Sequence, residues 1–151
     1  MAYWLFKSEP ITYGIDHMAK DKQTAWTGVR NYQARNWMRD QMQVGDHAFF
    51  YHSNCDEPAI VGIVKVTAAA HPDETQFDET SDYYDPKSTR EAPRWVNVRV
   101  QFVKKTTPVT LVELKKHKKL EKMRILQKGN RLSITPIDPA EWEFITKKLM
   151  A

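Results

Sequence analysis

Residues 94–103 place the strongest constraint on how this chain can fold. Apolar and polar residues alternate there, with Val96, Val98, Val100 and Phe102 set against Asn97, Arg99 and Gln101. A period of two puts alternate side chains on opposite faces of a β-strand, so one face of this strand is apolar. The chain must therefore build a β-sheet with at least one face buried against a core.

Three further segments predict partners for that strand. Residues 3–7 are mostly aromatic and apolar, and Pro10 limits the strand because proline lacks an amide hydrogen and restrains the residue before it. Residues 48–51 and 59–66 are apolar runs rich in β-branched and aromatic residues, separated by turn-forming residues 53–58. We expect these two runs to form a strand pair.

Helical spacing predicts short helices between and after the strands. Ile15, Met18 and Ala19 have such spacing, and it is stronger over residues 30–42, with Gly45 as the expected end.

Two capping patterns predict helices in the last third of the chain. Thr110 and Glu113 form a capping box at the start of an expected basic helix. Asp138, Pro139 and Glu141 combine an N-cap, a first-position proline and a third-position glutamate, followed by an apolar stripe through Trp142, Ile145 and Leu149. The chain is expected to end in a packed helix.

The order of these elements favours an α+β fold in one domain, residues 1–151. A chain of 151 residues is about one ordinary domain long. Strands and short helices mix irregularly, without the strand-helix rhythm of a parallel α/β sheet, so we expect a curved or closed sheet. Residues 71–93 carry acids and three prolines with few aliphatic residues, and we interpret them as an excursion loop with a functional role.

Composition excludes several classes of protein. The 41% hydrophobic and 28% charged residues are typical of a folded chain rather than a disordered one. No apolar stretch approaches the roughly 18 to 20 residues of a membrane span, and the N-terminus lacks the pattern of a signal peptide. The single cysteine, Cys55, excludes an internal disulfide and a multi-cysteine metal site. We therefore expect a cytoplasmic protein without contact to a membrane.

The positive charge is concentrated near the C-terminus. Residues 1–103 hold 11 basic and 14 acidic side chains, whereas residues 104–151 hold 12 basic and 5 acidic ones. Such a surface can attract a polyanion. For the densest run taken alone, Lys115-Lys116-His117-Lys118-Lys119, a solvated helix face is the simpler interpretation, because lysine-rich surfaces are common.

Common catalytic and cofactor motifs are absent. The five glycines are too dispersed for a dinucleotide or phosphate loop, and neither a nucleophile elbow nor a zinc-protease helix is present. Cys55 lies three residues after His52, and a histidine can activate a thiol. Proximity in sequence carries little geometric information, so a thiol in a turn is the simpler interpretation. His52 itself can either donate a hydrogen bond to a ligand or cap a strand end.

Trp26 is the most informative candidate for ligand binding. It stands outside any helical pattern, with Arg30 and Asn31 close behind it. A buried core tryptophan is the ordinary interpretation. An aromatic face beside a guanidinium and an amide also suits a heterocyclic base. Tyr83 and Tyr84, beside a proline-fixed bend in the excursion loop, suggest a lid.

Five ordered motifs resemble the EVE domain of the PUA-like superfamily, and within it the thymocyte nuclear protein-like family with its bacterial members. The motifs cover nearly the whole chain and are YWLFKSEP at 3–10, WTGVRNYQARN at 26–36, FYHSN at 50–54, YYDPKS at 83–88 and GNRLS at 129–133.

The resemblance implies a PUA-like β pseudo-barrel with surrounding short helices and a pocket that reads modified bases. Carried over onto matching positions, the ligand-binding residues are Ser8, Trp26, Arg30, Asn31, Tyr51, His52, Pro86, Lys87, Ser88, Arg131 and Ser133. Trp26 is expected to stack on the base, while polar side chains read its edges and basic ones hold phosphates.

We therefore expect a non-catalytic module that recognises a modified nucleobase in DNA or RNA through an aromatic pocket. Its partner is nucleic acid, and we expect no cofactor, no metal ion, no catalytic residue and a monomeric chain. One alternative is an enzyme acting on a modified nucleoside or nucleobase, in which His52 with Glu9 or Asp85 supplies acid–base catalysis. Another is a protein-interaction domain whose pocket has lost its ligand.

Overall fold

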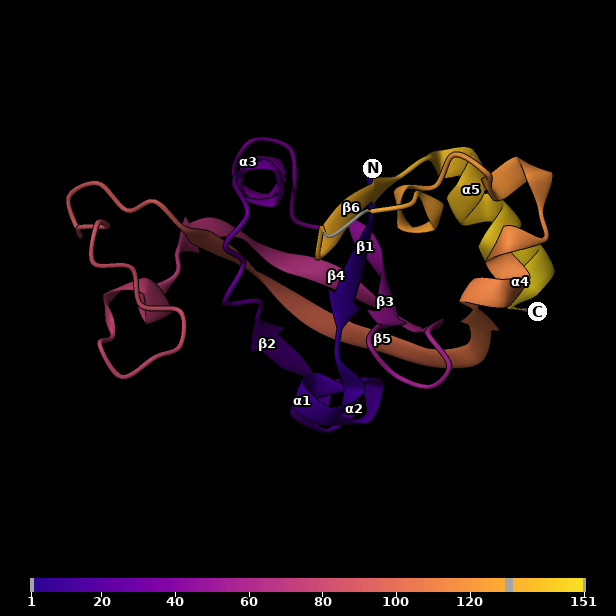
Figure 1. Ribbon diagram of the computed structural model, residues 1–151, viewed down its shortest axis with the longest axis horizontal. Coiled ribbons are helices and arrows are strands. Elements are labelled where there is room, and N and C mark those ends of the chain that lie inside the picture. The colour runs from indigo at the N-terminus through magenta and orange to yellow at the C-terminus, as the bar shows by residue number, and fades with distance from the viewer. Residues whose placement is uncertain (1, 130–131, 151) are drawn as a thin grey trace.

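A six-stranded mixed sheet organises the protein (Figure 1). The computed structural model describes residues 2–129 and 132–150. The strands lie in the order β2-β5-β4-β3-β1-β6, with β1 parallel to β3 and the other pairs antiparallel. Their bounds are β1 Tyr3–Ser8, β2 Gln23–Ala25, β3 His47–His52, β4 Ala59–Pro72, β5 Val96–Thr110 and β6 Ile134–Ile137. Within the described residues the edge strands β2 and β6 do not pair, so the sheet is open. The expected α+β class is confirmed.

Short helices cover both faces of the sheet. The α-helices are α1 Pro10–Tyr13, α2 Ile15–Asp21, α3 Tyr32–Asp40, α4 Leu111–Lys115 and α5 Pro139–Phe144. Single turns complete them: η1 Glu74–Phe77, η2 Lys118–Leu120 and η3 Arg124–Leu126 are 3-10 turns, and η4 Ile145–Leu149 is a π turn. Both predicted N-caps form, but only one is a full capping box. Asp138 and Glu141 make the reciprocal pair at α5, whereas at α4 only the Thr110 hydroxyl accepts from Glu113 N, at 3.1 Å, and the Glu113 carboxylate contacts His117 instead.

Strand alternation divides the apolar side chains into two cores, one on each face of the sheet. On β1, Phe6 points to the first core and Leu5 to the second; on β3, Phe50 and Phe49 separate in the same way. Figure 1 shows α1 and α2 on one side of the sheet and α4 and α5 on the other. The Trp142 ring seals the second core by stacking on the Phe49 ring at 4.1 Å.

The hairpin of β4 and β5 is longer than the sequence predicts. The strands have 14 and 15 residues, against predicted ranges of 59–66 and 94–103. Several register shifts let them bend and twist, and such bulges blur the period of two from which a strand is recognised. Their far end carries the excursion loop, which projects away from the rest of the sheet (Figure 1). The loop covers residues 73–95 rather than 71–93, because β4 continues to Pro72 and β5 begins only at Val96.

Two boundaries near the N-terminal half also differ from expectation. Strand β2 was not predicted, since three residues are too few to show a period. Helix α3 begins at Tyr32 rather than residue 30, because the Asn31 side chain accepts from Ala34 N at 3.0 Å and caps the helix. It also ends at Asp40, well before Gly45, whose φ of +98° places it in the turn into β3.

Candidate functional site

A pocket of about 510 Å³ opens on the face of the sheet that carries the first core. Most of its wall comes from the end of β1, the end of α1, strand β2 and residues 26–29, and the excursion loop adds one tyrosine. Its lining residues are Lys7, Ser8, Glu9, Thr12, Tyr13, Thr24, Ala25, Trp26, Thr27, Gly28, Val29, Tyr83 and Ser133. The wall is thus rich in aromatic rings, hydroxyl groups and backbone, and it carries one carboxylate and one ammonium group.

Trp26 belongs to the core and to the pocket at once. It is 8% exposed, and its ring packs against Phe6 at 5.1 Å and edge-on to Phe50 at 5.7 Å. Its indole N–H has no hydrogen-bond partner among the described residues, yet it is not among their fully buried unpartnered atoms. Packing therefore holds the ring rigidly while its N–H stays accessible.

Tyr13 forms a second aromatic side of the pocket. Its ring meets Trp26 edge-on at 6.4 Å, and its hydroxyl donates to Asp21 Oδ2 at 2.8 Å. Burial, with the hydrogen bond to Asp21, raises the pKa of Tyr13 to about 12, so the phenol stays neutral. Its backbone carbonyl accepts the Ser8 hydroxyl at 2.6 Å, which ties α1 to the end of β1.

Gly28 and Tyr83 meet where the excursion loop closes on the pocket wall. Gly28 has a φ of +84°, and a Cβ placed on it would lie 2.6 Å from Tyr83 Cζ. Only glycine adopts this backbone conformation readily and also lets the tyrosine ring approach so closely. The ring of Tyr83 is half-exposed, so it borders the pocket as a rim.

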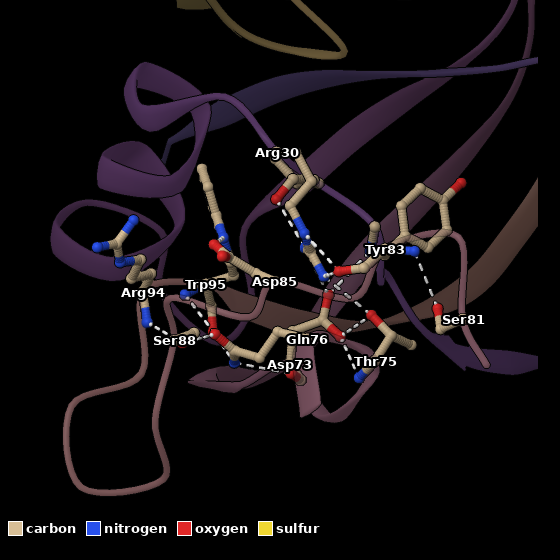
Figure 2. Close-up of polar contacts among 12 residues, drawn as sticks. Arg30, Asp73, Thr75, Gln76, Ser81, Tyr83, Asp85, Ser88, Arg94 and Trp95 are labelled. Atoms are coloured by element: carbon tan, nitrogen blue, oxygen red, sulfur yellow. Dashed lines mark hydrogen bonds and ion pairs between the residues drawn. The ribbon is translucent and has the colours of Figure 1, made fainter. Parts of the chain in front are cut away.

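Asp73 and Arg30 fasten the loop to that wall (Figure 2). The fully buried Asp73 carboxylate accepts from Gly28 N at 2.9 Å, from Arg30 Nη1 at 3.3 Å and from Thr75 N at 2.9 Å. Arg30 also donates to the Tyr83 carbonyl from Nε at 3.2 Å and Nη2 at 2.8 Å. Its guanidinium lies 5.3 Å from the Trp95 ring. Arg30 is thus committed to holding Tyr83 in place.

A buried amide organises the rest of the loop. Gln76 donates to the carbonyls of Asp73 and Trp95 at 2.7 and 2.8 Å, and it accepts from the Ser88 hydroxyl at 2.6 Å. The Trp95 indole donates to Asp85 at 2.7 Å, and this hydrogen bond lowers the pKa of Asp85. The predicted excursion loop is therefore a small structure with a polar core of its own.

His52 caps a helix. Its Nε2 accepts from Ile15 N, the first residue of α2, at 3.0 Å. Burial lowers the pKa of His52 below its usual value of 6.5, with Lys105 acting in the same direction and Asp16 against it. The acceptor role requires the neutral imidazole.

Three of the predicted site residues come together in the pocket: Ser8, Trp26 and Ser133. The other described residues predicted to bind the ligand do not line it. The side chain of Tyr51 packs in the second core, on the opposite face of the sheet. Asn31, Arg30, His52 and Ser88 are engaged in the structural contacts above. Pro86 and Lys87 are exposed on the excursion loop, and Arg131 lies outside the described residues.

Sequence reasoning missed other parts of the wall. Glu9 had been considered only for catalysis, and Tyr83 only as part of a lid. Lys7 and Thr24 belong to strands, where nothing local marks a pocket. Gly28 is the exception, because an isolated glycine can mark a place where another part of the chain approaches the backbone closely, and so could have predicted this contact.

The basic C-terminal run lies away from the pocket. Helix α4 and turn η2, which carry it, pack on the second core through Leu114 and Leu120. The four lysines of the run are exposed, with Lys116 paired to Glu113 at 3.7 Å. This placement favours the solvated-face interpretation.

Residues 2–129 and 132–150 contain no group of three or more His, Cys, Asp or Glu side chains arranged to hold a metal ion. None of their helices has the length and apolar character needed to span a membrane.

The chain is similar to known proteins over nearly its whole length. It matches the EVE domain over residues 2–148. Thymocyte nuclear protein 1 of Gallus gallus is 44% identical over 162 residues, covering 95% of this chain and 66% of the chicken protein. The Homo sapiens protein is 41% identical over 163 residues, covering 95% of this chain and 72% of its own length. The chain thus spans about two thirds of the length of these curated relatives.

Solved structures agree with this similarity. A Pseudomonas syringae protein has a TM-score of 0.92 at 43% identity, covering 96% of this chain and 97% of that one. The crystal structure of human THYN1 protein in complex with 5-methylcytosine-containing DNA has a TM-score of 0.90 at 41% identity, covering 96% of this chain and 95% of that one.

Removing the Asp73 carboxylate should release the excursion loop. In Asp73→Ala, Gly28 N and Thr75 N lose their acceptor and Arg30 loses its buried partner, so we expect the free energy of unfolding to fall by about 3 kcal/mol. Glu74→Ala is the matched control, because its ion pair with Arg90 is exposed and should contribute less than about 1 kcal/mol. Urea unfolding and hydrogen exchange across residues 73–95 measure both effects. Equal losses in the two variants would contradict the anchoring role of Asp73.

The helix cap at His52 should make stability depend on pH. Because the folded-state pKa is lowered, the unfolded chain binds the proton more readily, so the cap's contribution is complete above about pH 6.5 and is lost as pH falls through the folded pKa. In His52→Gln an amide oxygen replaces the imidazole nitrogen as a non-titrating acceptor. Denaturation from about pH 8 to about pH 5 should show a flatter profile for His52→Gln than for wild type. The exposed His71, changed to Gln, is the control and should leave the profile nearly unchanged.

Proposed function

The chain belongs to the EVE domain family, and on this premise we propose that it binds a modified cytosine base of DNA in the pocket around Trp26. The observation that carries the proposal is its similarity to human THYN1 protein, whose structure contains DNA with 5-methylcytosine. The similarity covers 96% of this chain, including the elements that form the pocket. We take 5-methylcytosine as the first ligand to test.

The shape and lining of the pocket support a single extruded base as its occupant. A base inside a duplex cannot reach a wall formed by Trp26 and Tyr13, so it must leave the stack. Unstacking costs a few kcal/mol, and contacts with aromatic rings in the pocket offset part of that cost. Since Phe6 and Phe50 hold Trp26 in place, little side-chain entropy is lost when a base arrives.

Polar groups around the rings are suited to reading the edges of a base. The Trp26 N–H is accessible, and the hydroxyl groups of Thr27 and Ser133 belong to the same wall. Of the basic residues expected to hold phosphates, Lys87 is exposed, whereas Arg30 is occupied by Asp73 and Tyr83. Lys87 therefore remains a candidate for contact with the phosphate backbone.

The proposed enzyme alternative has no specific observation in its favour. His52 accepts a backbone hydrogen bond at α2, and Asp85 accepts the Trp95 indole. Neither residue lines the pocket. Glu9 does line it, but its suggested catalytic partner, His52, does not.

Blocking the pocket tests the proposal. Thr27 is exposed and lines the pocket, so Thr27→Trp should fill the space with an indole and weaken binding to a duplex with one 5-methylcytosine by roughly tenfold or more. Thr107→Trp adds the same bulk at an exposed position of β5 outside the pocket and should leave affinity nearly unchanged. Fluorescence anisotropy with methylated and unmethylated duplexes measures both. Equal binding of the two duplexes by wild type, unaffected by Thr27→Trp, would rule the proposal out.

A further inference from the structure

We propose that Glu9 selects an amino-pyrimidine over a keto-pyrimidine, so that the pocket takes 5-methylcytosine and rejects thymine. The inference rests on the proposed function and adds to it the residue that reads the base. The problem it addresses is chemical: thymine and 5-methylcytosine carry the same ring methyl group. A pocket that sensed only that methyl group would confuse the two bases.

The backbone of Glu9 is fixed at the pocket wall. Glu9 lies between the end of β1 and the start of α1, and its carbonyl accepts from Thr12 N at 3.0 Å and Tyr13 N at 2.8 Å. Although it occupies the N-cap position of α1, its side chain makes no capping hydrogen bond. The helix that follows this part of the pocket wall therefore leaves the carboxylate unused.

The carboxylate of Glu9 keeps acceptor capacity. Oε1 accepts one hydrogen bond, from Asn54 Nδ2 at 3.1 Å, which orients the side chain from the turn after β3. No cation among the described residues lies within 4.0 Å of it, and Oε2 has no partner among them. A carboxylate has several acceptor sites and no donor, so the Glu9 carboxylate can accept further hydrogen bonds.

An unpaired carboxylate beside DNA is unfavourable unless a base compensates for it. Glu9 would repel the phosphate backbone, because neighbouring like charges raise the free energy of the complex. The exocyclic N4 amine of cytosine offers the compensation, since it donates a hydrogen bond that a glutamate accepts. Thymine has a carbonyl oxygen at the same ring position, and two acceptors then face each other.

The indole N–H of Trp26 complements the other edge of the base. It belongs to the same pocket wall as Glu9 and has no hydrogen-bond partner among the described residues. Cytosine presents acceptors at N3 and O2 beside its amine, so a pocket with one acceptor and one donor complements it.

The test compares two bases at one position. Duplexes carry either 5-methylcytosine or thymine opposite an abasic site, so that extrusion of either base breaks no base pair. Wild type should prefer 5-methylcytosine by about tenfold. In Glu9→Gln the amide can present either its oxygen or its NH₂ group, so the ratio of the two affinities should fall to near unity. Glu57→Gln removes the same charge from an exposed residue outside the pocket and should keep the wild-type ratio.

The outcomes separate this inference from the proposed function. If Glu9→Gln folds and keeps the wild-type ratio, while wild type still prefers methylated over unmethylated cytosine, the inference is overturned and the proposed function stands. If wild type shows no preference for the methylated base and Thr27→Trp has no effect, the proposed function fails, and the inference fails with it. A ratio lost in Glu9→Gln and retained in Glu57→Gln supports both.

Discussion

The buried carboxylate of Asp73 is the constraint on which the pocket depends. A carboxylate withdrawn from water is tolerated only when hydrogen bonds and an opposite charge compensate it. Here those partners come from two segments: the Gly28 amide of the pocket wall with the nearby Arg30 guanidinium, and Thr75 of the excursion loop. Arg30 also donates a hydrogen bond to the carbonyl of Tyr83. One charged group therefore fixes the position of the wall and of the rim together, which preorganises the pocket before any ligand arrives.

The pocket and the basic C-terminal run lie against different cores of the sheet. The second core, closed by α4 and α5 with Trp142 stacked on Phe49, carries the C-terminal lysines on its outer side. The first core continues into the pocket through Trp26, which packs against Phe6 and Phe50 and keeps an accessible indole N–H. The concentration of positive charge therefore does not mark the pocket. Hydrogen-bonding capacity remains there, among the described residues, at the indole N–H of Trp26 and, beyond its one hydrogen bond from Asn54, at the carboxylate of Glu9.

Features encoded by local sequence were predictable, and features made by distant contacts were not. The alternation at 96–102 and the caps at Thr110 and Asp138 each depend on neighbours within a few residues, and all of them form. Strand β2 depends on pairing with β5, and the contact between Asp73 and Gly28 joins segments 45 residues apart, so neither leaves a local pattern. For the candidate site, the motifs include Ser8, Trp26 and Ser133, which line the pocket. They also include Tyr51, which packs in the second core, because a motif gives a position but not the sheet face that the alternation of β3 assigns to it.

The central claim is that a modified base of DNA enters the pocket beside Trp26. NMR titration tests it most directly, because the indole N–H of Trp26 gives its own signal and reports on the inside of the pocket. With a duplex containing one 5-methylcytosine, we expect the signals of the Trp26 indole and the Gly28 amide to shift, while those of Lys118 and Lys119 stay nearly still. The unmethylated duplex should produce much smaller shifts at Trp26. Shifts confined to the C-terminal lysines, or equal for the two duplexes, would contradict the account.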